Sequence, residues 1–184
     1  KLYVDTAVAG SGGASVLGDL SDATTSGTGN LGLVTTLPSL TTGNANTVIG
    51  YSAGIDITTG HNNVFMGNVS GYNVTTGHNN VGIGVNALLT LTSASRNVAI
   101  GKSAAYYTNA NYNRAVGYEA LMQNRVGTSN NAFGYRALDA NLSGPNNAFG
   151  VHALGSNTTG QYNTAFGESA LKNNTTASSN TAVG

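Results

Sequence analysis

A short pattern of apolar and polar positions recurs along most of this chain. Each copy reads Asn, a variable residue, a residue that is mostly Ala, an apolar residue and Gly. The Asn residues of the nine copies are Asn46, Asn63, Asn80, Asn97, Asn113, Asn130, Asn146, Asn163 and Asn180. The apolar residues are Ile49, Met66, Ile83, Ile100, Val116, Phe133, Phe149, Phe166 and Val183. The Gly residues, 16 or 17 positions apart, are Gly50, Gly67, Gly84, Gly101, Gly117, Gly134, Gly150, Gly167 and Gly184. Such a strict, short period indicates a repeat protein in which one small unit stacks on the next.

The second half of each copy carries a different pattern. Three residues after the Gly comes a small residue, and Leu often follows it directly, as in Ala120-Leu121. Two neighbouring apolar residues do not suit a half-buried strand, in which apolar and polar residues alternate. The pair therefore favours one short helical turn per repeat, as in residues 168–174, or a tight corner, although a single turn is unstable by itself. A second short strand is the alternative.

Together, the two halves predict an all-β fold, a parallel β-solenoid or β-roll of about eight coils with 16–17 residues each. In each coil, the residues around Ala-apolar-Gly are expected to form a short strand whose apolar side chain points inward. The Gly ends this strand at a turn. Coils stacked at about 4.8 Å would form a rod on the order of 40 Å long. The stacked Asn side chains are expected to form a ladder that satisfies amide and backbone groups along the rod.

The chain divides into three segments. Residues 1–9 are expected to end a stalk or coiled-coil-like junction, because apolar residues recur there before a Gly-rich break. Residues 10–45 are expected to form a linker and a cap over the open strand edge of the first coil. Residues 46–184 hold the solenoid repeats, and residue 184 lies inside a repeat unit. Because one coil buries few apolar side chains, other coils and other subunits are expected to complete the core, most simply in a homotrimer.

Charge and cysteine content narrow the function classes. Charged residues make up 8% of the chain, and the formal net charge is zero. A chain without a basic stripe lacks the usual means of binding nucleic acid. Cys is absent, so no disulfide stabilises the fold, and no run of apolar residues is long enough to predict a membrane span. The sequence predicts no cofactor.

Few residues offer catalytic or metal-binding chemistry. His61 and His78 occupy the same position in two copies, so stacked coils around a three-fold axis would bring them together as candidate metal ligands. Solvated turn residues are the simpler interpretation. The scattered carboxylates, which share no face with a catalytic partner, are Asp56, Glu119, Asp139 and Glu168. Because hydrolases need a nucleophile with an orienting base or two carboxylates at a fixed separation, the sequence predicts no catalytic site and no enzyme.

Two residue types offer surfaces for binding. Tyr51, Tyr118 and Tyr135 directly follow the Gly of their copies. On a regular face they could stack on sugars of a host surface, and the alternative is packing between coils or subunits. Thr-Thr pairs begin at Thr41, Thr58, Thr75 and Thr158. A regular Thr face can bind ice, but these pairs are predicted to fall in turns and are missing from several copies.

The motif Asn97-Val-Ala-Ile-Gly101 resembles the head repeat of trimeric autotransporter adhesins, which form left-handed parallel β-rolls as trimers. Later units, such as residues 146–160, resemble repeats of tail-fibre-like proteins, and residues 1–5 and 17–22 resemble junction segments of phage tail fibres. These resemblances imply a structural shaft segment of a trimeric tail fibre or surface adhesin that supports attachment to a host cell, located in a virion or at a cell surface. The implied partners are further copies of the chain, neighbouring fibre or tail proteins and, in the alternative function of a direct binding module, a host-surface glycan.

Overall fold

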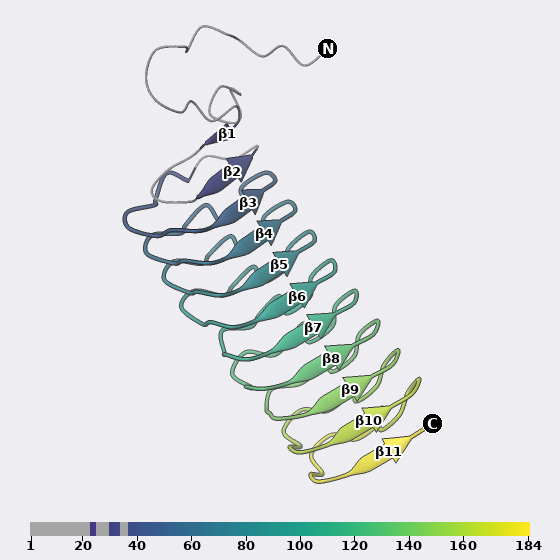
Figure 1. The fold of residues 1–184 in the computed structure, drawn as a ribbon. Coiled ribbons are helices and arrows are strands. Elements are labelled where there is room, and N and C mark those ends of the chain that lie inside the picture. Colours follow the sequence, from purple (N-terminus) through teal and green to yellow (C-terminus); the bar gives the residue numbers. More distant parts are fainter. Residues whose placement is uncertain (1–22, 25–29, 34–36) are drawn as a thin grey trace, which may run out of the picture.

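A computed structural model describes residues 23–24, 30–33 and 37–184. Within these residues the chain winds into a rod in which each coil stacks on the one before it (Figure 1). Strands, turns and bends make up this part of the chain, and no helix occurs in it. The predicted all-β parallel solenoid is therefore confirmed. The expected stalk at residues 1–9 lies outside the described residues.

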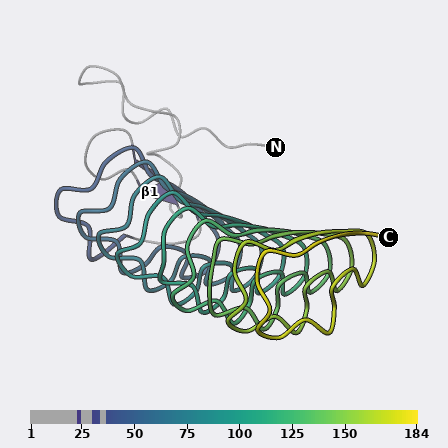
Figure 2. The same cartoon turned by 90° about the horizontal axis from the view of Figure 1, so that it is seen from below.

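Each coil contributes one short strand to a single sheet. The strands are β1 (Ala23–Thr24), β2 (Leu31–Leu33), β3 (Thr47–Ile49), β4 (Val64–Met66), β5 (Val81–Ile83), β6 (Val98–Ile100), β7 (Arg114–Val116), β8 (Asn131–Phe133), β9 (Asn147–Phe149), β10 (Thr164–Phe166) and β11 (Thr181–Val183). From β2 to β11 the strands follow the chain order and pair in parallel, whereas β1 pairs antiparallel with β2. Equivalent repeat positions are direct neighbours, as Ala132 and Ala148 are between β8 and β9. Figure 2 shows the same rod from below, with each coil slightly offset from the last.

The sheet extends further toward the N-terminus than the Gly-based repeat. In the segment expected to be a linker and cap, Asn30 precedes β2 in the same way that Asn46 precedes β3. The backbone N–H of Asn46 donates to Asn30 Oδ1 at 2.7 Å. This coil has Val34 where the later copies have Gly, so a search anchored on Gly does not find it.

The inner face of each strand carries the residue two positions before the Gly, and not the apolar residue directly before it. In β6, Ala99 is buried, whereas Ile100 is 38% exposed. Successive side chains of an extended chain point to opposite faces. Because Asn97 is buried, alternation places Ala99 inward and Ile100 outward. The expectation that the apolar residue before the Gly forms the core is therefore wrong.

The Ala-Leu pair of each repeat forms two consecutive turns instead of a helical turn or a second strand. The Ala120 N–H donates to the Gly117 carbonyl at 3.4 Å, and the Asn124 N–H donates to the Leu121 carbonyl at 3.3 Å. The φ angles of Glu119 and Leu121 are 51° and 56°, in the left-handed region. Left-handed residues break the alternation of an extended chain, so both Ala120 and Leu121 point inward and are buried. The expected helical turn is wrong for the described coils.

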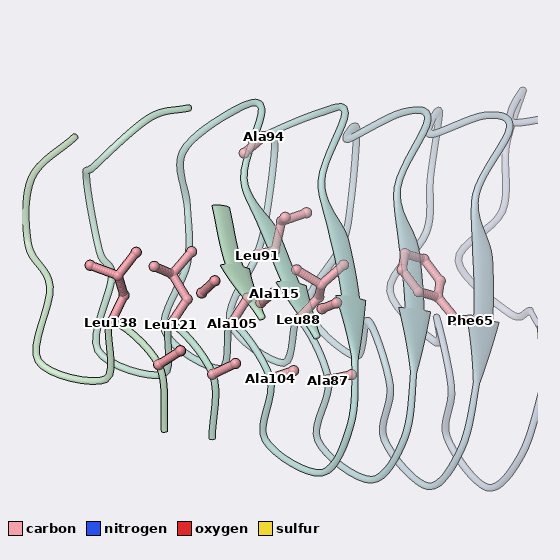
Figure 3. Close-up of a cluster of buried hydrophobic side chains, with 14 of the residues drawn as sticks. Phe65, Ala87, Leu88, Leu91, Ala94, Ala104, Ala105, Ala115, Leu121 and Leu138 are labelled. Carbon is pink, nitrogen blue, oxygen red and sulfur yellow. The ribbon is translucent and has the colours of Figure 1, made fainter. Parts of the chain in front are cut away.

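The core is a row of small residues and Leu along the inside of the rod (Figure 3). In most coils, a small side chain on the strand faces a large side chain on the turn, or the reverse. Most strands offer Ala to the core and most turns offer Leu, whereas β4 offers Phe65. Where Phe65 lies, the turn positions are Gly54 and Gly71, and a Cβ on Gly71 would come within 2.6 Å of the Phe65 ring. Complementary volumes thus keep the interior close-packed in coils of different composition.

Candidate functional site

A column of apolar side chains runs along the outer face of the sheet. It consists of the residue directly before the Gly in each copy, and we call it the apolar column. Its members are Ile49, Met66, Ile83, Ile100, Val116, Phe133, Phe149, Phe166 and Val183. The exposed fraction is 38–82% for Met66, Ile100, Phe166 and Val183, and the other five members are half-buried. Contiguous apolar surface of this kind marks an interaction site more often than scattered apolar residues do.

The column changes character along the rod. From β3 to β7 it has no aromatic side chain, from β8 to β10 it is a stack of phenyl rings, and in β11 it ends on Val183. The ring centroids of Phe133 and Phe149 are 5.0 Å apart with an angle of 5° between their planes, and those of Phe149 and Phe166 are 5.4 Å apart. These spacings follow the separation of the strands, because each ring sits on the next coil.

A buried Asn ladder fixes the strands that present this column. The Oδ1 of each ladder Asn accepts a hydrogen bond from the backbone N–H of the next ladder Asn at 2.7–3.1 Å, from Asn30 to Asn180. The amide group also reaches the following coil, as in Asn63 Nδ2 to the Gly77 carbonyl at 2.9 Å. Because buried amides are costly when unpaired, the ladder holds the coils in one axial register.

A column of Gly forms the corner after each strand. The φ angles of the Gly residues that end the strands lie between 125° and 143°, a region that side chains disfavour. A Cβ on Gly50 would lie 2.7 Å from the carbonyl oxygen of Gly67 in the next coil, and the other corners down to Gly167 are as tight or tighter. The chain at this corner can therefore approach its neighbour only where no side chain intervenes.

One charge interrupts the outer face of the sheet. The first residue of each strand forms a second outward column, which consists of Thr47, Val64, Val81, Val98, Arg114, Asn131, Asn147, Thr164 and Thr181. Arg114 is its only charged member, and the apolar column has none. The exposed Arg114 side chain donates from Nη1 to Asn131 Oδ1 at 3.2 Å, and Asn131 Nδ2 donates to Asn147 Oδ1 at 2.7 Å.

Two of the three tyrosines proposed for glycan contact stack on each other. The rings of Tyr118 and Tyr135 are 5.3 Å apart and nearly parallel, while Lys102 Nζ lies 5.9 Å from the Tyr118 centroid. His152 meets Tyr135 edge to face at 5.4 Å. A sugar ring stacks on an open aromatic face, and in this pair one face of each ring lies against the other ring. Their geometry favours packing along the rod. Tyr51 lies apart from this stack, four strands from Tyr118, and is 68% exposed.

Two of the four scattered carboxylates meet around one arginine. Arg136 Nε lies 3.4 Å from Glu119 Oε2 and donates to Asp139 Oδ2 at 2.8 Å. The hydrogen bond to Asp139 raises the pKa of the Arg136 guanidinium, and a hydrogen bond with Glu119 raises the pKa of the Tyr118 hydroxyl. An arginine between two carboxylates is an ion-pair network, and it offers neither an acid–base pair nor a nucleophile.

Asp56 and Glu168 belong to the coils after β3 and β10 and do not join this network. In the described part of the chain, no three His, Cys, Asp or Glu residues come together as a metal site. Nor does that part contain a helix able to cross a membrane.

The coils bring His61 and His78 together, but in a geometry that does not suit a shared metal. Their ring centroids are 4.9 Å apart and the planes differ by 4°. The lone pairs of an imidazole lie in the plane of the ring, and a zinc–nitrogen bond is about 2.0–2.1 Å long. An ion in the plane of the His61 ring is therefore too far from the plane of the His78 ring. His78 Nδ1 instead lies 3.0 Å from Ser95 Oγ.

The Thr-Thr pairs stack in the turns that connect the coils. The first Thr of each pair uses its hydroxyl within the rod, as Thr58 Oγ1 does when it donates to the Thr75 carbonyl at 3.1 Å. Only the second hydroxyl of each pair is left on the exposed side, as at Thr59 and Thr76. A single column of hydroxyl groups is not the regular two-dimensional array that ice binding would need.

Comparison of the chain with protein-family models, with curated proteins and with solved structures returned no match. The surfaces of the solenoid therefore carry the functional argument. Among them the sequence-based reasoning missed the apolar column, because it assigned these residues to the core. The signal that could have found it is the odd spacing of three between the ladder Asn and the apolar residue, which puts the two on opposite faces of a strand.

Proposed function

We propose that this chain is a structural fibre segment: a shaft that assembles with further copies of itself into a homotrimer and supports attachment of a tail fibre or surface adhesin to a host cell. In this proposal, function lies in length, stiffness and valency. The ladder of Asn30 to Asn180 supplies the stiffness, and the stacked coils supply the length.

The observation that carries this proposal is the apolar column. It repeats once per coil, with the spacing of about 4.8 Å that separates neighbouring strands in a sheet. A partner that covers it along its whole length must present apolar groups at the same spacing. Another copy of the same solenoid, parallel and side by side, meets this condition without any further requirement.

The three-fold state rests on the resemblance of the repeats to the heads of trimeric adhesins. Cyclic symmetry supports it, because parallel copies around one axis form a closed assembly and bury every copy of the face equally. A trimer of this chain, with 18.5 kDa per copy, would have a mass of about 55 kDa.

Sedimentation equilibrium of the purified chain tests the assembly. We expect the wild type to sediment as a trimer and Ile83→Glu to sediment as a monomer, because a charge in the centre of an apolar interface remains unpaired. Thr59→Glu is the matched control, since Thr59 is exposed in a turn outside the sheet. A stable wild-type monomer at micromolar concentration would contradict the proposal.

A second experiment separates the shaft from the alternative of a glycan-binding or surface-binding module. The purified assembly is applied to a glycan array and to candidate host cells. A shaft gives no binding by itself, whereas a longer fibre that contains it binds through a distal part. Saturable binding of the purified segment that Tyr51→Ala abolishes, with assembly intact, would favour the alternative, because Tyr51 has the most exposed ring of the tyrosines proposed for glycan contact.

A further inference from the structure

A periodic apolar column does not fix the axial position of its partner by itself. If one copy slides by one coil, apolar residues again meet apolar residues, because the column has an apolar side chain in every coil. Register in such repeats requires a feature that does not repeat, as a single polar position sets the register of a coiled coil.

We call the side of the outer face where the strands begin its first edge, and the side where the strands end its second edge. Each edge holds one such feature. Arg114 is the first residue of β7 and the only charge in the two outward columns of the sheet. On the other edge, just after the strands, charges of both signs occur in three successive coils. Lys102 directly follows the Gly after β6, whereas Glu119 and Arg136 each lie two residues after the Gly that follows β7 and β8.

Parallel copies around one axis bring the first edge of one copy against the second edge of the next. In register, Arg114 then lies at the level of Glu119. A slip of one coil in one direction places it at the level of Lys102, and a slip in the other direction places it at the level of Arg136. Only the in-register arrangement pairs opposite charges, and both nearest alternatives bring cations together.

We propose that Arg114 of one copy pairs with Glu119 of the neighbouring copy and thereby fixes the register of the parallel assembly. This inference rests on the proposed self-assembly and names the pair that makes it specific. The pair also completes a balanced group of charges: Glu119 is 3.4 Å from Arg136, which is bonded to Asp139, so one cation and two anions are already together in each copy. Arg114 from the neighbour supplies the missing positive charge.

A cysteine cross-linking scan tests the register, and the chain offers a clean background because it contains no Cys. One chain carries Asn131→Cys on the first edge. The second chain carries Tyr118→Cys, Tyr135→Cys or Val151→Cys, which lie on the second edge at three successive levels. A disulfide requires Cα atoms about 4.4–6.8 Å apart, so a shift of one coil, about 4.8 Å, changes which pair reacts. A short bis-maleimide linker repeats the scan with a longer reach.

In the wild-type background we expect the same-level pair, Asn131→Cys with Tyr135→Cys, to exceed the two others by about tenfold. Arg114→Glu should move the product to the neighbouring levels, where Lys102 and Arg136 attract the new carboxylate. Arg114→Gln removes the charge without adding a repulsive one, so it should assemble and spread the product over all three levels. Arg125→Glu is the control, because Arg125 lies outside the sheet over the Tyr107 ring, and should leave the wild-type pattern unchanged.

The outcomes separate this inference from the proposed function. A wild-type monomer removes the proposed function. An assembled wild type that gives no product between the two edges, or the same single product in Arg114→Gln, overturns the register pair and leaves the assembly standing.

Discussion

The coils on either side of Thr108 have the same backbone but fill one interior column with different chemistry. This column, seven residues after each Gly, is apolar in the N-terminal coils and consists of Asn in the C-terminal ones. Its members are Ile57, Val74, Leu91, Thr108, Asn124, Asn141, Asn157 and Asn174. Ile57 to Asn157 are all buried, so an amide replaces a hydrocarbon side chain at equal depth.

The Asn half of this column is a second ladder. Asn157 Nδ2 donates to Asn141 Oδ1 at 2.8 Å, and Asn174 Nδ2 donates to Asn157 Oδ1 at 2.9 Å. Asn146 Nδ2 joins it to the ladder before the strands through Asn141 Oδ1 at 3.2 Å. A buried amide is tolerated where the coil above or below offers another amide, and a hydrocarbon is tolerated where its neighbours are hydrocarbons. The unit that determines stability is therefore the column and not the single coil.

The Gly corner is common to both regions, so breaking it should cost the same in each. We expect Gly84→Ala and Gly134→Ala each to lower the free energy of unfolding by about 4 kcal/mol, because both positions have positive φ and the new methyl group meets a backbone carbonyl of the next coil. Chemical denaturation followed by circular dichroism measures the loss.

Gly155→Ala is the matched control for these two variants. Gly155 lies in a turn, has no positive φ and offers a Cβ whose nearest neighbour is 3.1 Å away, so its substitution should change stability far less. A clear difference between Gly84→Ala and Gly134→Ala would show that the two regions differ in backbone as well as in core chemistry.

An amide placed in the apolar half tests the column directly. Val74→Asn should lower the free energy of unfolding by about 3 kcal/mol, because it removes buried hydrocarbon and leaves an amide between Ile57 and Leu91 without a partner. Val126→Asn, at a position that is 72% exposed, should cost little. Adding Leu91→Asn to Val74→Asn should cost less than the sum of the single variants, since the two amides can bond each other. Full additivity would refute the column as the stabilising unit.

The period, the strand and the solenoid could be predicted from the sequence because they depend on residues that repeat without exception. The direction of the side chains could have been derived from the same pattern, since a buried ladder Asn forces the residue three positions later outward. The turn geometry could not. Leu121 and Arg136 adopt left-handed φ angles that their residue types do not suggest, and stacking imposes these angles against local preference.

The candidate site was less accessible to sequence reasoning than the fold. Glu119 and Arg136 are separated along the chain by a full coil, and only the stacking brings them together, whereas Asp139 lies three residues after Arg136. The stacking also decides which tyrosine faces are covered, because Tyr118 and Tyr135 meet only as members of successive coils. To say which side chains of neighbouring coils meet, the coils must be aligned in register. The spacing of 16 or 17 residues gives this alignment only once the missing residue of each 16-residue coil is located in the polar turn before the next ladder Asn.

Thr108 marks the junction of the two regions, and a small change there should improve the rod. Its Oγ1 is buried and has no hydrogen-bond partner among the described residues, because Leu91 on one side is apolar and the amide of Asn124 on the other is bonded to Gly127. Thr108→Val keeps the shape and removes the unpaired hydroxyl, so the free energy of unfolding should rise by about 1 kcal/mol. Thr90→Val is the matched control, since Thr90 Oγ1 donates to the Tyr106 carbonyl at 3.0 Å and its loss should lower stability. If both substitutions shift the denaturation midpoint in the same direction, the junction is no weaker than the regions that it joins.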